Sequence, residues 1–83
     1  MKKIYVVNGA AHAGFGETTA RMIIANGDKV IGLYEKEDEA NATKLVTEFG
    51  HDKLELFCVD YCSLSELKKI ISLLDVEIDG FVN

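Results

Sequence analysis

Short apolar runs alternate with amphipathic segments along the whole chain. The apolar runs, each bounded by turn residues, are residues 4–7, 29–34, 54–59 and 80–83. Runs of this kind are typical of strands buried on both faces of a parallel sheet. Between them lie three segments with apolar side chains at helical spacing, which are residues 17–26, 37–49 and 63–74. The pattern predicts strands and helices in strict alternation.

Local signals mark the ends of these elements. Gly27 and Gly50 follow the first two helical segments, at the position where a glycine commonly ends a helix. Ser63 and Glu66 have the spacing of a capping box, so the third helix is expected to begin after Ser63. Gly32 lies inside the second strand and indicates that another group approaches the backbone closely there.

The alternation also predicts how these elements are arranged. Each right-handed crossover carries its helix over a face of the sheet, so the strands are expected to be parallel in an α/β fold. In a doubly wound sheet the strand order is 3-2-1-4, with the first two helices on one face and the third on the other. We therefore expect residues 1–83 to form one domain, a three-layer sandwich that is half of a doubly wound fold. Ligands bind such sheets where the strand order switches, here between the first and fourth strands.

Composition narrows the class of protein. The chain has 83 residues, of which 48% are hydrophobic, and it contains no proline, as expected for a single globular domain. Its net charge of −5 argues against a nucleic-acid partner, because neutralising phosphates requires a basic face. The apolar run after Met1-Lys2-Lys3 is too short for a signal peptide or a membrane span. No membrane partner is expected, and the cytoplasm is the expected location.

The two cysteines do not form a C-x-x-C redox motif, because three residues separate Cys58 from Cys62. Together with His12 and His51 they include ligand types that bind zinc. The favoured interpretation is that both are reduced, small side chains, with Cys58 in a buried strand and Cys62 in the turn that follows. No metal site is predicted.

A glycine-rich loop, residues 8–16, joins the first strand to the first helix. Such a turn directs backbone N–H groups and the positive end of the helix dipole at one point, which favours binding of a nucleotide phosphate. Gly9 is expected to make the tight turn, Gly14 to let the backbone approach a pyrophosphate, and Gly16 to let the helix pack on the sheet. His12 lies in the same loop and could contact phosphate, or it could be an exposed histidine without a role.

Two other classes of protein share parts of this pattern. Gly9 and Gly14 have the spacing of a P-loop, but Phe15-Gly16 replaces the lysine and hydroxyl residue that would hold phosphate and metal. A phosphoacceptor receiver domain could use Asp60 after the third strand, yet it also needs acids after the first strand, where Asn8-Gly9 offers none. The glycines could also form a turn without a ligand.

Glu35 is the candidate for recognising a ribose. It lies at the end of the second strand, nineteen residues past Gly16, where dinucleotide-binding folds carry an acid that accepts hydrogen bonds from ribose hydroxyls. A carboxylate there repels a 2′-phosphate and favours NAD, although the neighbouring Lys36 leaves NADP open. Alternatively, Glu35 simply begins the acidic run of residues 35–39.

These features resemble the N-terminal half of the Rossmann-type domain of short-chain dehydrogenases/reductases. That family has a T-G-x-x-x-G-x-G turn after the first strand, an aspartate after the third and N-N-A-G after the fourth. In this chain Asn8-Gly9 and Gly14-Phe15-Gly16 match the glycine turn, and Val59-Asp60 matches the aspartate. The stretch 79–83 matches the approach to N-N-A-G, so the resemblance covers the whole chain.

The resemblance implies further contacts with a dinucleotide cofactor, NAD or NADP. Gly14, Phe15 and Gly16 then belong to the phosphate turn, and Tyr34 occupies the family's usual aspartate position at the end of the second strand. The Asp60 carboxylate would take the adenine amino group, with the backbone of Tyr61 beside it. As an alternative, Asp60 caps the turn before the third helix. Asn83 corresponds to the first asparagine of N-N-A-G, whose backbone lies near the adenosine ribose.

The chain departs from the family pattern in two places. Four residues separate Gly9 from Gly14 where the family has three. In addition, no residue matches the catalytic serine, tyrosine and lysine, which in the family lie beyond the fourth strand. The expected function is therefore the NAD(P)-binding portion of such an oxidoreductase, truncated before its catalytic region and inactive alone. The alternative is a non-catalytic interaction module. Because the fourth strand forms an open edge, self-association through it, or pairing with the missing half of the fold, is expected.

Overall fold

Strands and helices alternate along the chain in the computed structural model, which describes residues 2–74 and 77–82. The strands are β1 (Ile4–Asn8), β2 (Lys29–Glu35), β3 (Leu54–Val59) and β4 (Gly80–Val82). The helices are α1 (Phe15–Ala25), α2 (Glu39–Phe49) and α3 (Leu64–Leu74), and a short 3₁₀ turn, Lys36–Asp38, precedes α2. Every predicted element is present, with ends that differ by a few residues. Asn83, predicted to belong to the fourth strand, lies outside the described residues.

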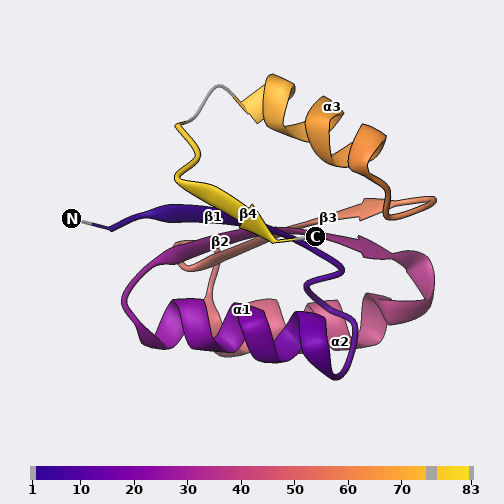
Figure 1. Ribbon diagram of the computed structural model, residues 1–83. Helices are drawn as coiled ribbons and strands as arrows, with labels where there is room; N and C mark the ends of the chain where they lie inside the picture. Colours follow the sequence, from indigo (N-terminus) through magenta and orange to yellow (C-terminus); the bar gives the residue numbers. More distant parts are fainter. Residues whose placement is uncertain (1, 75–76, 83) are drawn as a thin grey trace.

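The four strands form one parallel sheet in the order β3-β2-β1-β4. Helices α1 and α2 cover one face, and α3 lies over the other (Figure 1). This is the predicted three-layer α/β sandwich with a Rossmann-like strand order. The order reverses between β1 and β4, so the carboxyl ends of these two strands lie side by side.

Two apolar clusters hold the layers together. Neighbouring residues of β1 point to opposite faces, so Val7 packs under α1 and α2 while Val6 packs under α3. The α1–α2 side is larger and includes Ala20 of α1 and Leu45 of α2. On the α3 side, Leu67 is the fully buried contribution of the helix.

Glycines allow the layers to approach closely at two points. A Cβ on Gly32 would lie 2.4 Å from the Cβ of Ala10 and 2.7 Å from Cδ2 of Leu56, which confirms the close approach predicted in the second strand. A Cβ on Gly16 would lie 1.9 Å from the carbonyl oxygen of Gly9. Gly32 thus lets the glycine loop lie against the sheet, and Gly16 lets α1 lie against the glycine loop.

The predicted cap of the third helix forms, since Ser63 Oγ accepts a hydrogen bond from the Glu66 N–H at 3.2 Å. The expectation for Cys58 was wrong. It lies in β3 as predicted, but β3 is an edge strand and the Cys58 side chain is exposed. Among the residues described, no helix is long and apolar enough to cross a membrane.

Candidate functional site

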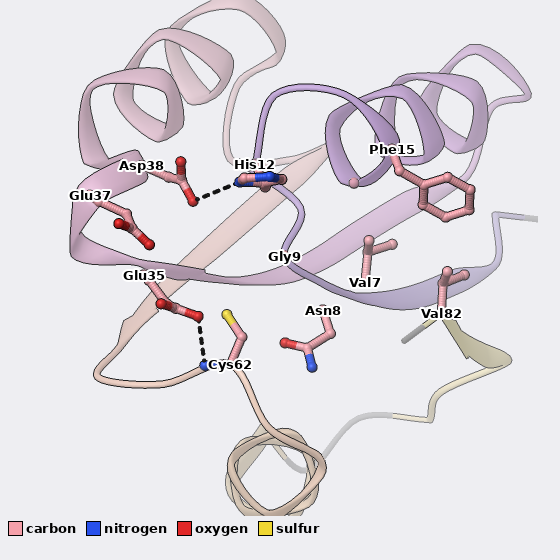
Figure 2. Close-up of a pocket in the computed structure, with 11 residues that line it drawn as sticks. Val7, Asn8, Gly9, His12, Phe15, Glu35, Glu37, Asp38, Cys62 and Val82 are labelled. Atoms are coloured by element: carbon pink, nitrogen blue, oxygen red, sulfur yellow. Dashed lines mark hydrogen bonds and ion pairs between the residues drawn. The ribbon is translucent and has the colours of Figure 1, made fainter.

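A cleft of about 310 Å³ opens where β1, β2 and β4 end (Figure 2). Its walls come from the glycine loop, the 3₁₀ turn, the end of β4 and the connection between β3 and α3. The lining residues are Val7, Asn8, Gly9, His12, Phe15, Gly16, Glu35, Glu37, Asp38, Cys62 and Val82. The cleft therefore lies at the switch point that the sequence predicted.

The glycine loop is fixed to β2 by its own backbone. The N–H groups of Gly9 and Ala10 both donate to the carbonyl oxygen of Leu33, at 2.9 and 3.1 Å, and His12 N–H donates to the carbonyl of Gly9. Ala10 and Ala11 are completely buried. The loop folds over these two buried alanines and leaves the His12 side chain on the surface.

The first turn of α1 faces the cleft. Gly14 precedes the helix with a φ of 110°, and no atom lies within 4 Å of where its Cβ would be, so a ligand can approach this backbone. The N–H groups of Phe15 and Gly16 lie in the first turn of α1, where backbone N–H groups have no acceptor within the helix. Such N–H groups, with the helix dipole behind them, are typical of anion-binding sites.

Helix α2 supports the glycine loop through Asn41. Its Nδ2 donates to the carbonyl oxygen of Ala11 at 2.7 Å and to Glu17 Oε1 at 2.8 Å. Arg21 binds Glu17 and, with two hydrogen bonds, Glu48 of α2. The hydrogen bonds from Asn41 and Arg21 hold the pKa of Glu17 below its usual value. The sequence does not indicate this support, apart from the i,i+4 spacing of Glu17 and Arg21.

One wall of the cleft is acidic. Glu35, Glu37 and Asp38 line it, and His12 Nδ1 lies 3.5 Å from Asp38 Oδ2 (Figure 2). Among the residues that the structure describes, none of those lining the cleft is a lysine or an arginine. Carboxylates accept hydrogen bonds from hydroxyl groups and repel phosphate, so this wall suits an unphosphorylated ribose.

Glu35 is held in place by the connection between β3 and α3. Its Oε2 accepts a hydrogen bond from the backbone N–H of Cys62 at 3.1 Å (Figure 2). Burial, and then the negative charge of Glu35, raise the pKa of the Cys62 thiol. Cys62 thus contributes a half-buried thiol to the wall of the cleft.

The structure brings together about half of the site residues that the sequence predicted. Gly9, His12, Phe15, Gly16 and Glu35 line the cleft. Gly14 lies at the N-terminus of α1 and lines an adjacent groove instead.

The remaining predicted residues lie elsewhere. Tyr34 points to the opposite face from Glu35, as alternation along β2 requires, and lines a separate cavity of about 220 Å³ beside α2. Burial and the neighbouring Cys58 raise the pKa of its phenol. Asp60 and Tyr61 are exposed and outside the lining of the cleft. Asn83 lies outside the described residues.

No group of three or more histidine, cysteine, aspartate or glutamate side chains in the described ranges could hold a metal ion. Both cysteines are free. Two contacts at the cleft were not indicated by the sequence. They are the ion pair of Asp38 with His12 and the hydrogen bond from the backbone N–H of Cys62 to Glu35.

The strand order and the position of the cleft define a Rossmann-like α/β fold. The same fold occurs in a solved structure described as "putative 3-oxoacyl-reductase from bacillus thuringiensis". The match has a TM-score of 0.83 at 17% sequence identity and covers 100% of this chain and 36% of that one. This chain thus spans about a third of the length of its structural neighbour. Protein-family models gave no match, and neither did the curated proteins.

Proposed function

We propose that this chain binds NAD as the nucleotide-binding portion of an oxidoreductase of the short-chain dehydrogenase/reductase type. The observation that carries the proposal is that the glycine loop and Glu35 line the same cleft at the switch point of the sheet. These two features would contact the pyrophosphate and the adenosine ribose of a dinucleotide. The fold shared with the protein described as a "putative 3-oxoacyl-reductase" supports the same class.

The residues present fit such a cofactor. A volume of about 310 Å³ lies in the range of small-molecule sites. The pyrophosphate would bind at the N-terminus of α1, where Gly9, Phe15 and Gly16 line the cleft. The apolar side chains of Val7, Phe15 and Val82 would pack against the uncharged parts of the dinucleotide.

NAD is proposed in preference to NADP because of the acidic wall. A 2′-phosphate on the ribose would approach the carboxylates of Glu35, Glu37 and Asp38. With no lysine or arginine among the described lining residues, only His12 could offset this repulsion. A 2′-hydroxyl, in contrast, donates a hydrogen bond to a carboxylate.

In a complete enzyme of this type, the nicotinamide exchanges a hydride with a carbonyl or alcohol group of the substrate. The residues of this chain would hold and orient the adenosine and pyrophosphate portions. No residue here is assigned as proton donor, so we propose that the chain alone binds the cofactor without turnover.

A thermal titration tests the proposal. At a NAD concentration about ten times its Kd, binding stabilises the native state by about 1.4 kcal/mol and raises Tm by about 5–10 °C in a domain of this size. NADP at the same concentration is expected to give a smaller shift. If neither cofactor shifts Tm at about 1 mM while circular dichroism shows a folded chain, the proposal is wrong and the interaction module remains.

A further inference from the structure

The first turn of α1 carries an acidic side chain beside the N–H groups that are proposed to bind phosphate. Glu17 directly follows Phe15 and Gly16 in this turn. A carboxylate at this position stabilises the helix, because it lies at the positive end of the helix dipole. It would also repel the pyrophosphate of a dinucleotide, whose charge has the same sign. Phosphate binding therefore requires that this carboxylate is held away from the cleft.

Both oxygens of the Glu17 carboxylate accept hydrogen bonds from side chains outside the cleft. Oε1 accepts from Nδ2 of Asn41 at 2.8 Å, and Oε2 accepts from Nε of Arg21 at 2.9 Å. Arg21 lies one turn further along α1, and Asn41 lies on α2, which covers the same face of the sheet (Figure 1). None of these three described side chains lines the cleft. The charge of Glu17 is therefore directed toward α2 and away from the proposed phosphate site.

Arg21 is shared between two carboxylates. Glu48 of α2 accepts two hydrogen bonds from its guanidinium, at 2.7 and 2.8 Å, whereas Glu17 accepts one. Without Asn41, Glu17 would keep a single side-chain hydrogen bond, to a cation that a second acid also binds. The bond from Asn41 is thus the contact that belongs to Glu17 alone and sets the orientation of its carboxylate.

The same amide nitrogen of Asn41 fixes the middle of the glycine loop. Nδ2 carries two hydrogens, and its other bond goes to the carbonyl oxygen of Ala11 at 2.7 Å. The next carbonyl oxygen, that of His12, accepts from the backbone N–H of Glu17 at 3.1 Å. Two successive carbonyl groups of the loop are therefore bound to α2 and to the first turn of α1. Asn41 joins the loop, α1 and α2 at one point.

We infer that Asn41 is a positioning residue for phosphate binding, which holds the Glu17 carboxylate away from the pyrophosphate and fixes the glycine loop around it. This inference rests on the proposed function, because it assumes that the pyrophosphate binds at the first turn of α1. Asn41 lies outside the lining of the cleft, so it acts through Glu17 and Ala11 and does not touch the cofactor. The role requires an amide, since a side chain without N–H groups can make neither bond.

Isothermal titration calorimetry with NAD tests the inference. Asn41→Ala should raise the Kd by about tenfold, the value of a hydrogen bond to a charged group, because the carboxylate is released beside the phosphates. Removing the released charge should restore binding. The double variant Asn41→Ala/Glu17→Gln is therefore expected to bind NAD at least about threefold more tightly than Asn41→Ala. A residue that only stabilises the fold would show no such rescue, since the second change removes a further contact.

Glu48→Gln is the matched control. It weakens the link between α1 and α2 through Arg21 and removes no contact of Asn41. Because Glu48 lies outside the lining of the cleft, the NAD Kd of this variant should stay within about twofold of that of the unmodified chain.

Hydrogen exchange without NAD gives a second measurement, on the glycine loop itself. The amide of His12 donates to the carbonyl of Gly9, and the amide of Glu17 donates to the carbonyl of His12. Both amides should exchange at least about tenfold faster in Asn41→Ala, because local opening of the loop is then easier. In Glu48→Gln their exchange should stay unchanged.

Three results would overturn the role of Asn41 and leave the proposed function intact. They are an unchanged NAD affinity in Asn41→Ala, a double variant that binds no better than Asn41→Ala, and equal losses of affinity in Asn41→Ala and Glu48→Gln. Unchanged exchange of both loop amides would also contradict it. A folded, unmodified chain that binds no NAD refutes the proposed function, and this role with it. If Asn41→Ala does not fold by circular dichroism, Asn41→Asp decides, because it keeps the shape of the side chain without its N–H groups and should weaken NAD binding at least as much.

Discussion

Replacing Gly16 by alanine is expected to lower the free energy of unfolding by about 3 kcal/mol and to abolish measurable NAD binding. The added Cβ would lie 1.9 Å from the carbonyl oxygen of Gly9 and 2.8 Å from its carbonyl carbon. Both are backbone atoms, so α1 or the glycine loop must move. Either movement separates the first-turn N–H groups from the end of β1. Urea unfolding followed by circular dichroism measures the change in stability.

Gly50→Ala is the matched control for this change. Gly50 follows α2 with a φ of 83°, a backbone conformation that favours glycine. Unlike at Gly16, nothing lies within 4 Å of the position that its Cβ would take. Gly50→Ala is expected to cost about 1–3 kcal/mol through backbone strain alone, because a φ of 83° with a ψ of 158° is a conformation that essentially only glycine adopts, and to leave NAD affinity unchanged. A Gly16→Ala variant as stable as the Gly50→Ala variant, with normal NAD affinity, would contradict the tight packing of α1 on Gly9.

Replacing Glu35 by glutamine is expected to weaken NAD binding by about 10- to 100-fold, the value of a charge-assisted hydrogen bond. The carboxylate is proposed to accept from the ribose, and its Oε2 already accepts from the N–H of Cys62. The amide also removes one negative charge from the wall that repels a 2′-phosphate. NADP binding should therefore fall less, and the preference for NAD should shrink. Isothermal titration calorimetry with both cofactors measures these affinities.

Glu37→Gln removes the same charge from the same cleft two residues further along the chain. No direct contact with the ribose is proposed for Glu37, so its effect on NAD affinity is expected to stay within about threefold. Equal losses in the two variants would show that the acidic wall acts only through its total charge. In that case Glu35 would have no specific role in binding ribose.

The fold could be predicted from the sequence because its signals are local. Apolar runs such as residues 54–59 and the glycines after α1 and α2 define each element without knowledge of its neighbours. The strand order followed from the doubly wound pattern, which alternating strands and helices favour. The start of α1 was harder to predict, because Gly14 precedes it and no side chain caps it. The exposure of Cys58 depends on β3 being an edge strand, which composition does not reveal.

The candidate site was predicted only where a local motif carries it. Gly9, Gly16 and Glu35 occupy positions fixed by the strand-turn-helix geometry and line the cleft together. The contact of His12 with Asp38 depends on how the glycine loop folds over its buried alanines. Asn41 could be found only once α2 was placed beside the glycine loop. These contacts join segments far apart in the sequence, so no spacing rule indicates them.

The location of bound NAD tests the central claim most directly. Nitrogen-15 NMR of the labelled chain, titrated with NAD to about 1 mM, reports which backbone amides a ligand approaches. The account predicts saturable shifts concentrated on the glycine loop, residues 9–16, and on Glu35 and Cys62, around the cleft where these residues meet. A well-dispersed spectrum without shifts, or with shifts confined to α2 and β3, would contradict it.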